Sequence, residues 1–123
     1  MSYFNRKLDH INLNVPDLEK TVKFYTETLG FKVVNRFKKE REFVFVTDGN
    51  ITYEFIENKN LTNAVIDHIA YVSDDIKADF DHFKSLGLLT TELGFVDFIF
   101  DNGVHYFFIK GEGNEKIEFC QKG

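Results

Sequence analysis

The 123-residue sequence contains very little cysteine and proline and no tryptophan, and these shortages exclude several classes of protein. Its single cysteine, Cys120, excludes an internal disulfide and a cysteine-based zinc finger. A single proline, Pro16, and the lack of Ser/Gly-rich stretches leave no recognisable linker between domains. No apolar run approaches the roughly 20 residues of a membrane-spanning helix, and the first residues lack the apolar core of a signal peptide. We therefore expect one cytoplasmic domain over residues 1–123.

Positive charge is also scarce. The chain has 15 Lys and Arg against 20 Asp and Glu, a formal net charge of −5, and it has no basic block. Because nucleic acids and anionic membranes attract positively charged surfaces, we expect neither as a partner. Aromatic residues, in contrast, are abundant, with 15 Phe and 5 Tyr. Such a content favours half-buried strands or an apolar cavity.

The chain repeats itself at its most distinctive residues. Asp9-His10-Ile11 recurs 58 positions later as Asp67-His68-Ile69, and Tyr53-Glu54-Phe55 is echoed 64 positions later by Ile117-Glu118-Phe119. The two matches occur in the same order and frame the same pattern of elements. The larger second offset indicates that the second copy carries extra residues in its latter half.

Hydrophobic periodicity predicts the order β-α-β-β-β in both copies. In the first copy, about 6–58, a helix capped by Asp17 and ended by Gly30 follows the first strand; the strands are 9–15, 31–37, 42–47 and 51–57. In the second copy, about 64–122, Asp74 or Asp75 caps a helix that ends at Gly87; the strands are 65–72, 88–93, 104–110 and 116–121. Residues 94–101 form an aromatic-rich insertion whose shape the pattern does not predict.

Two histidines and two glutamates occupy equivalent places in the copies: His10 with His68, and Glu54 with Glu118. Because side chains alternate across a sheet, all four would point inward if the two copies curled into one concave surface. Burying such groups unpaired is costly, and a divalent cation offsets that cost. Mixed nitrogen and oxygen ligands suit zinc, nickel, cobalt, iron or manganese. The alternative is that each is a solvent-facing or structural residue of its strand.

Four other residues of ligand or nucleophile type fit this pattern less well: Glu57, His82, His105 and Cys120. Glu57 has the opposite strand parity to Glu54 and, by the pattern, no counterpart in the second copy. His82 lies among charged helix residues and is expected to be solvated, while Cys120 is expected to be buried and inert. Four aromatic residues would either line an apolar cleft or form ordinary core: Phe45, Phe55, Tyr106 and Phe108.

At these residues the chain resembles the vicinal oxygen chelate superfamily. The resemblance rests on the segment Asp9–Leu18, on Phe24-Tyr25 and Leu29-Gly30-Phe31, and on Asp67-His68-Ile69-Ala70 and Glu115–Phe119. The superfamily includes glyoxalase I, fosfomycin-resistance proteins, methylmalonyl-CoA epimerase, extradiol dioxygenases and bleomycin-binding proteins. It implies an α+β fold in which two βαβββ modules form a curled, cleft-enclosing mixed sheet.

The resemblance also implies a ligand set and a reaction. The His, Glu, His, Glu order of glyoxalase I falls on four residues here: His10, Glu54, His68 and Glu118. A metal-dependent lyase of the lactoylglutathione lyase type would convert a hemithioacetal of a 2-oxoaldehyde to a 2-hydroxyacyl thioester through an enediolate. It would use one divalent ion per site (nickel, zinc, cobalt or manganese), with Glu118 as the base and Glu54 as the alternative. The superfamily further implies a homodimer that acts on a small molecule in detoxification.

Two departures leave the substrate open. Asn14 stands where glyoxalase I usually carries a basic residue that contacts the glutamyl carboxylate of glutathione, and the loop 111–114 also differs from the usual type. Two other functions therefore remain beside glyoxalase chemistry. One is a binding protein that sequesters a hydrophobic ligand or antibiotic without turnover. The other is a related metal-assisted reaction, either epimerisation or opening of an epoxide by a thiol or water.

Overall fold

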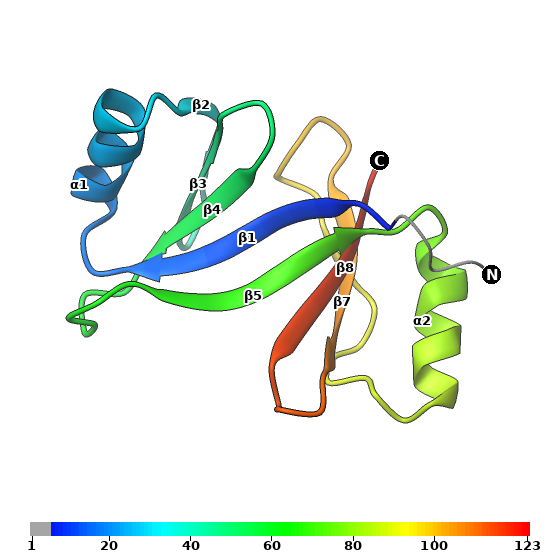
Figure 1. Ribbon diagram of the computed structural model, residues 1–123. Helices are drawn as coiled ribbons and strands as arrows, with labels where there is room; N and C mark the ends of the chain where they lie inside the picture. The colour runs from blue at the N-terminus through cyan, green and yellow to red at the C-terminus, as the bar shows by residue number, and fades with distance from the viewer. Residues whose placement is uncertain (1–5) are drawn as a thin grey trace. The chain divides into compact units, whose positions relative to one another are not determined.

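The computed structural model describes residues 6–123, which form two compact units of four strands and one helical segment each (Figure 1). The N-terminal unit is His10–Asp67, and the C-terminal unit is His68–Gly123 together with residues 6–9. Residues 1–5 lie outside the described residues, so the prediction that the first residues are not a signal peptide stays a prediction. Among the described helices, none has the length and apolar character needed to span a membrane.

The N-terminal unit has the predicted order β-α-β-β-β. Its elements are β1 (Leu8–Val15), α1 (Leu18–Lys23), the π-helical turn η1 (Phe24–Thr28), β2 (Lys32–Lys38), β3 (Glu42–Thr47) and β4 (Thr52–Glu57). The strands lie in the order β2-β3-β4-β1, in which β1 runs parallel to β4 and the other neighbours are antiparallel. The predicted helix is therefore present, but its second half is π-helical. Thr26 lies in that half, and its hydroxyl donates to the carbonyl of Val22 at 2.8 Å.

The C-terminal unit repeats this arrangement with one correction. Its elements are β5 (Val65–Val72), α2 (Ile76–Ser85), β6 (Gly94–Val96), β7 (Val104–Lys110) and β8 (Lys116–Lys122), in the strand order β5-β8-β7-β6. The strand predicted over 88–93 is wrong, because only Leu89 forms an isolated bridge there, to Ile109. The leucines of that segment pack instead against the core beneath α2: Leu88, Leu89 and Leu93. The fold class is nevertheless the one predicted, an α+β fold with two βαβββ units.

In each unit the helix covers one face of the sheet, and this fixes which side chains occupy the other face. The N-terminal core gathers residues of α1 and alternate strand positions: Val15, Leu18, Val22, Val44, Val46 and Phe55. Phe55 therefore belongs to the helix-side core, so of the two alternatives given for it, ordinary core is the one observed. The C-terminal core is the counterpart: Ile76, Phe80, Phe107, Ile109 and Phe119. By strand alternation, Glu54 and Glu118 lie on the faces opposite to these cores.

Both helices begin in the same way. Asp17 and Asp75 are the N-caps, and each accepts a hydrogen bond from a first-turn amide at 3.0 Å. A second side chain, from the end of the unit's last strand, then accepts the amide of the first helical residue. Glu57 does this for Leu18 and Gln121 for Ile76, both at 2.9 Å. Glu57 thus has a counterpart in the second copy, contrary to the sequence pattern, and that counterpart is a helix-capping residue.

We expect Gln121→Leu to lower the free energy of unfolding by about 1 kcal/mol, the usual net value of a hydrogen bond lost from a protein. The side chain accepts from the Ile76 amide and also donates to the Asp74 carbonyl at 2.9 Å. Urea denaturation is the measurement. Gln121→Glu keeps the acceptor and should retain part of the stability, whereas equal losses in the two variants would contradict this capping role.

A short ionic network explains why the N-terminal residues belong to the C-terminal unit. The guanidinium of Arg6 donates two hydrogen bonds to the buried carboxylate of Asp79 on α2, a bidentate contact at 2.9 and 3.2 Å. The hydroxyl of Ser73 donates to the same carboxylate at 2.6 Å. The Lys7 carbonyl then accepts the amide of Val72 at 2.9 Å. Buried charge is stable only when it is paired and hydrogen-bonded, and Asp79 meets both conditions.

Candidate functional site

In the N-terminal unit, the predicted histidine and glutamate lie together on the face away from α1. Strand β1 is parallel to β4 with Asn12 opposite Glu54, and His10 is two residues earlier on the same face of β1. The Nε2 atom of His10 is 3.4 Å from Oε1 of Glu54. Both residues are buried, with 6% and 9% of their surface exposed.

The C-terminal unit builds the same pair in the same register. Strand β5 is parallel to β8 with Ala70 opposite Glu118, and His68 is two residues before Ala70. The Nε2 atom of His68 is 2.9 Å from Oε1 of Glu118, and both residues are 8% exposed. Each unit therefore brings together the histidine and glutamate that the repeat predicted for it.

A phenylalanine edge contacts each imidazole, and the sequence pattern did not predict this. The ring of His10 meets Phe45 with 5.6 Å between centroids at 84°, and His68 meets Phe108 with 5.0 Å at 88°. Phe45 is the β3 neighbour of Glu54, and Phe108 is the β7 neighbour of Glu118. The two phenylalanines are 63 positions apart, between the two offsets of the repeat. Edge-to-face packing of this kind holds the imidazole plane in place.

One neighbour of the carboxylates differs between the units. In the N-terminal unit, the side-chain amide of Asn12 donates to Oε1 of Glu54 at 2.7 Å, and Asn12 has none of its surface exposed. The side-chain amide of Asn14 in turn donates to the side-chain oxygen Oδ1 of Asn12 at 3.3 Å. At the equivalent position the C-terminal unit has Ala70, which has no polar side-chain atom. The two glutamates are therefore equivalent in register and different in surroundings.

The donor set of each pair suits a divalent metal ion. A neutral imidazole nitrogen and a carboxylate oxygen are common ligands of zinc and of other first-row divalent ions. Two ligand atoms about 2.0–2.2 Å from one ion, at angles between octahedral and tetrahedral, are about 2.8–3.6 Å apart. The observed N–O separations are 3.4 Å for His10–Glu54 and 2.9 Å for His68–Glu118. Both pairs therefore have ligand spacing without rearrangement.

The other candidate residues stay outside these pairs. His82 packs edge-on against Phe83 on α2, and His105 stacks against Phe95 with 4.5 Å between centroids. Cys120 is buried, as predicted. Burial, followed by the nearby negative charges of Asp9 and Glu118, raises the pKa of the Cys120 thiol far above its ordinary value. Since only the thiolate is an effective nucleophile, Cys120 is inert.

The extra residues of the second copy pack against the face that carries His68 and Glu118. A small apolar cluster joins the sheet residues Ala70, Val104 and Cys120 to Val96, Ile99, Phe100 and Tyr106. Ala70 is the β5 neighbour of Glu118, and Cys120 is two residues after Glu118 on the same face of β8. Residues 94–101, whose structure the sequence did not predict, thus form a short strand and then an apolar segment that covers one end of this face.

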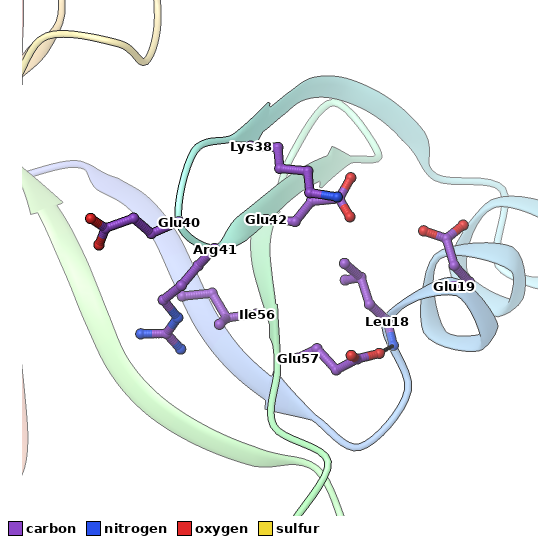
Figure 2. Close-up of a pocket in the computed structure, with 8 residues that line it drawn as sticks. All are labelled: Leu18, Glu19, Lys38, Glu40, Arg41, Glu42, Ile56 and Glu57. Carbon is purple, nitrogen blue, oxygen red and sulfur yellow. Dashed lines mark hydrogen bonds between the residues drawn. The ribbon is translucent and has the colours of Figure 1, made fainter.

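The N-terminal unit also contains a pocket of about 430 Å³ beside the start of α1 (Figure 2). It is lined mostly by charged side chains, with Leu18 and Ile56 as apolar lining: Glu19, Lys38, Glu40, Arg41, Glu42 and Glu57. Arg36 binds two of these carboxylates, Glu19 and Glu42, and its hydrogen bond holds the pKa of Glu42 below the usual range. Glu57 is occupied by the Leu18 amide. The charges of this pocket therefore stabilise the unit, and none of its lining residues is a histidine.

Two βαβββ units, each joining a histidine on its first strand to a glutamate on its last, define a duplicated α+β protein with paired residues of a type that can bind metal ions. The chain belongs to the Glyoxalase/Bleomycin resistance protein/Dioxygenase superfamily, whose family model matches residues 7–119. The match spans both units, as the sequence resemblance implied.

Individual relatives match over nearly the whole chain. The chain is 30% identical to the "Uncharacterized protein YwbC" of Bacillus subtilis, over 95% of this chain and 98% of that protein. It is 32% identical to a "Probable lactoylglutathione lyase" of Vibrio parahaemolyticus, over 95% of this chain and 91% of that protein. The crystal structure of methylmalonyl-CoA epimerase from Mycobacterium tuberculosis superposes with a TM-score of 0.81 at 16% identity, covering 100% of this chain and 93% of that one. At that identity the superposition shows the fold alone.

Proposed function

We propose that the chain is a metal-dependent lyase of the glyoxalase I type, with one divalent ion held by four ligands: His10, Glu54, His68 and Glu118. The observation that carries the proposal is the pair of buried histidine–carboxylate contacts in equivalent register, at 3.4 and 2.9 Å. Each pair offers one nitrogen and one oxygen, whereas a first-row divalent ion takes four or more ligands. The proposal assigns both pairs to one ion. We further propose that the protein works as a cytoplasmic homodimer in detoxification.

The reaction needs a group that removes a proton from the carbon next to a carbonyl. When bound, the metal supplies Lewis-acid stabilisation of the negative charge that develops on the substrate oxygens. Glu118 is our choice for the base, with Glu54 as the alternative. A buried carboxylate beside an imidazole is held within reach of the substrate carbon, takes the proton there and returns it to the neighbouring carbon. Phe45 and Phe108 keep the two imidazoles oriented and exclude water from the pairs.

Asn14 bears on which thiol adduct the enzyme accepts. Its neutral amide donates to Asn12, so this position offers no positive charge to a substrate carboxylate. The likeness to a probable lactoylglutathione lyase supports a hemithioacetal substrate, while Asn14 favours a thiol other than glutathione. Epimerisation is the second candidate. Its support is the fold shared with methylmalonyl-CoA epimerase, and it uses the same removal of a proton next to a carbonyl.

The test of this function begins with metal binding. Elemental analysis of the purified protein should find one divalent ion per chain, and His10→Ala and His68→Ala should each lose it. His82→Ala, which removes an imidazole outside the pairs, is the matched control and should keep the ion. The metallated protein should then isomerise hemithioacetals of methylglyoxal with glutathione or another thiol. Full metal affinity in either pair variant would disprove the shared site, and turnover of methylmalonyl-CoA alone would move the assignment to the epimerase.

A further inference from the structure

The Asn12 amide is the feature that distinguishes the two carboxylates of the repeat. It lies within the sheet, with none of its surface exposed, and its nitrogen is 2.7 Å from Oε1 of Glu54. A carboxylate oxygen can only accept, so the NH₂ end of the amide must face Glu54. The opposite end accepts from Asn14 at 3.3 Å, which holds the Asn12 side chain from both ends.

This hydrogen bond acts on the atom that also faces the imidazole. Oε1 of Glu54 is 3.4 Å from Nε2 of His10 and receives the Asn12 amide at the same time. A carboxylate held at one oxygen by a buried donor loses its freedom to rotate about its last bond. Hydrogen bonds of this kind to metal ligands set their orientation and raise metal affinity. In the C-terminal unit, Ala70 provides no such donor at the position opposite Glu118.

We propose that Asn12 is a positioning residue that holds the Glu54 carboxylate in its ligating orientation. The two equivalent glutamates then take unequal roles. Glu54 stays a fixed ligand, held by the Asn12 amide at 2.7 Å, which agrees with the assignment of proton transfer to Glu118. This inference rests on the proposed function, because it assumes that the histidine–glutamate pairs bind a metal ion.

The test measures Co²⁺ binding, which does not depend on turnover. Wild-type protein is stripped of metal and titrated with Co²⁺ against a chromogenic chelator, and the visible spectrum of the bound ion reports its ligands. Asn12→Leu keeps the shape of the side chain and removes the amide, so Kd for Co²⁺ should rise about 10–100-fold with an altered spectrum. Asn60→Leu, the same substitution at an exposed position outside the strands, is the matched control and should change Kd less than about threefold. The melting temperature of the metal-free protein separates loss of positioning from loss of fold.

Each outcome has one meaning. Failure of the wild type to bind Co²⁺ overturns the proposed metal function, and the role of Asn12 with it. Wild-type binding with an unchanged Kd and spectrum in Asn12→Leu overturns the positioning role alone. If Asn12→Leu does not fold, Asn12→Thr and Asn12→Val are compared instead. The two side chains have the same shape, and only that of Thr has a hydroxyl group that can donate to Glu54. Tighter Co²⁺ binding by the Thr variant supports the proposal, and equal affinities overturn it.

Discussion

Glu118→Gln is expected to lower kcat for hemithioacetal isomerisation by about 10²–10⁴-fold, the usual contribution of a general base. The substitution keeps the size of the side chain and an oxygen that can still bind a metal ion, but an amide cannot take up the proton. Glu118 is 8% exposed and lies 2.9 Å from His68, so the substitution changes a buried group that is already in contact with its imidazole. Steady-state kinetics with metal content measured on the same sample is the test.

Glu54→Gln is the matched comparison for this prediction. An amide oxygen at position 54 can still accept the hydrogen bond that Asn12 makes to Glu54, so the loss of rate should stay below about tenfold. Equal losses of rate in two fully metallated variants would show that the carboxylates share the proton transfer. A larger loss in Glu54→Gln would exchange the two assignments.

Phe107→Ala is expected to lower the free energy of unfolding by about 3–5 kcal/mol, the range for removing a buried aromatic ring. Phe107 has none of its surface exposed, and its ring packs against Phe80 and Phe119, both at 5.5 Å between centroids. These rings join α2 to β7 and β8. The remaining rings of Phe80 and Phe119 offer no polar atom to the cavity left by Ala, so water would not be stabilised there.

The control for this prediction is Phe95→Ala, because Phe95 is 51% exposed. Its loss should cost less than about 1 kcal/mol. Urea denaturation monitored by far-ultraviolet circular dichroism measures both variants. A Phe107→Ala variant as stable as Phe95→Ala would mean that the C-terminal core is not the main support of that unit.

The sequence was sufficient for those features that depend on local pattern. Strand alternation and the caps Asp17 and Asp75 predicted the order of elements, and the repeated Asp-His-Ile motif located both histidines. Within each unit the structure then joins the predicted histidine to the predicted glutamate.

Features that depend on strand register were not predictable. The contact between Asn12 and Glu54 spans 42 residues, and it exists because β1 and β4 pair with these two residues opposite each other. The helix-capping role of Gln121 likewise crosses 45 residues. Segment 88–93 was wrongly predicted as a strand, because its leucines are used for packing on the helix side. Periodicity shows that a segment has an apolar face, but it does not show which other element will pack against that face.

The difference between Asn12 and Ala70 also bears on the ancestry of the chain. Two units with the same element order and register are the product expected of gene duplication. In a half-length ancestor that assembled from identical copies, every residue would be present on both sides, so a substitution beside one glutamate would be made beside the other as well. Fusion into one gene removes that constraint. The position opposite the glutamate can then change in one half alone, and here it is Asn12 in one half and Ala70 in the other.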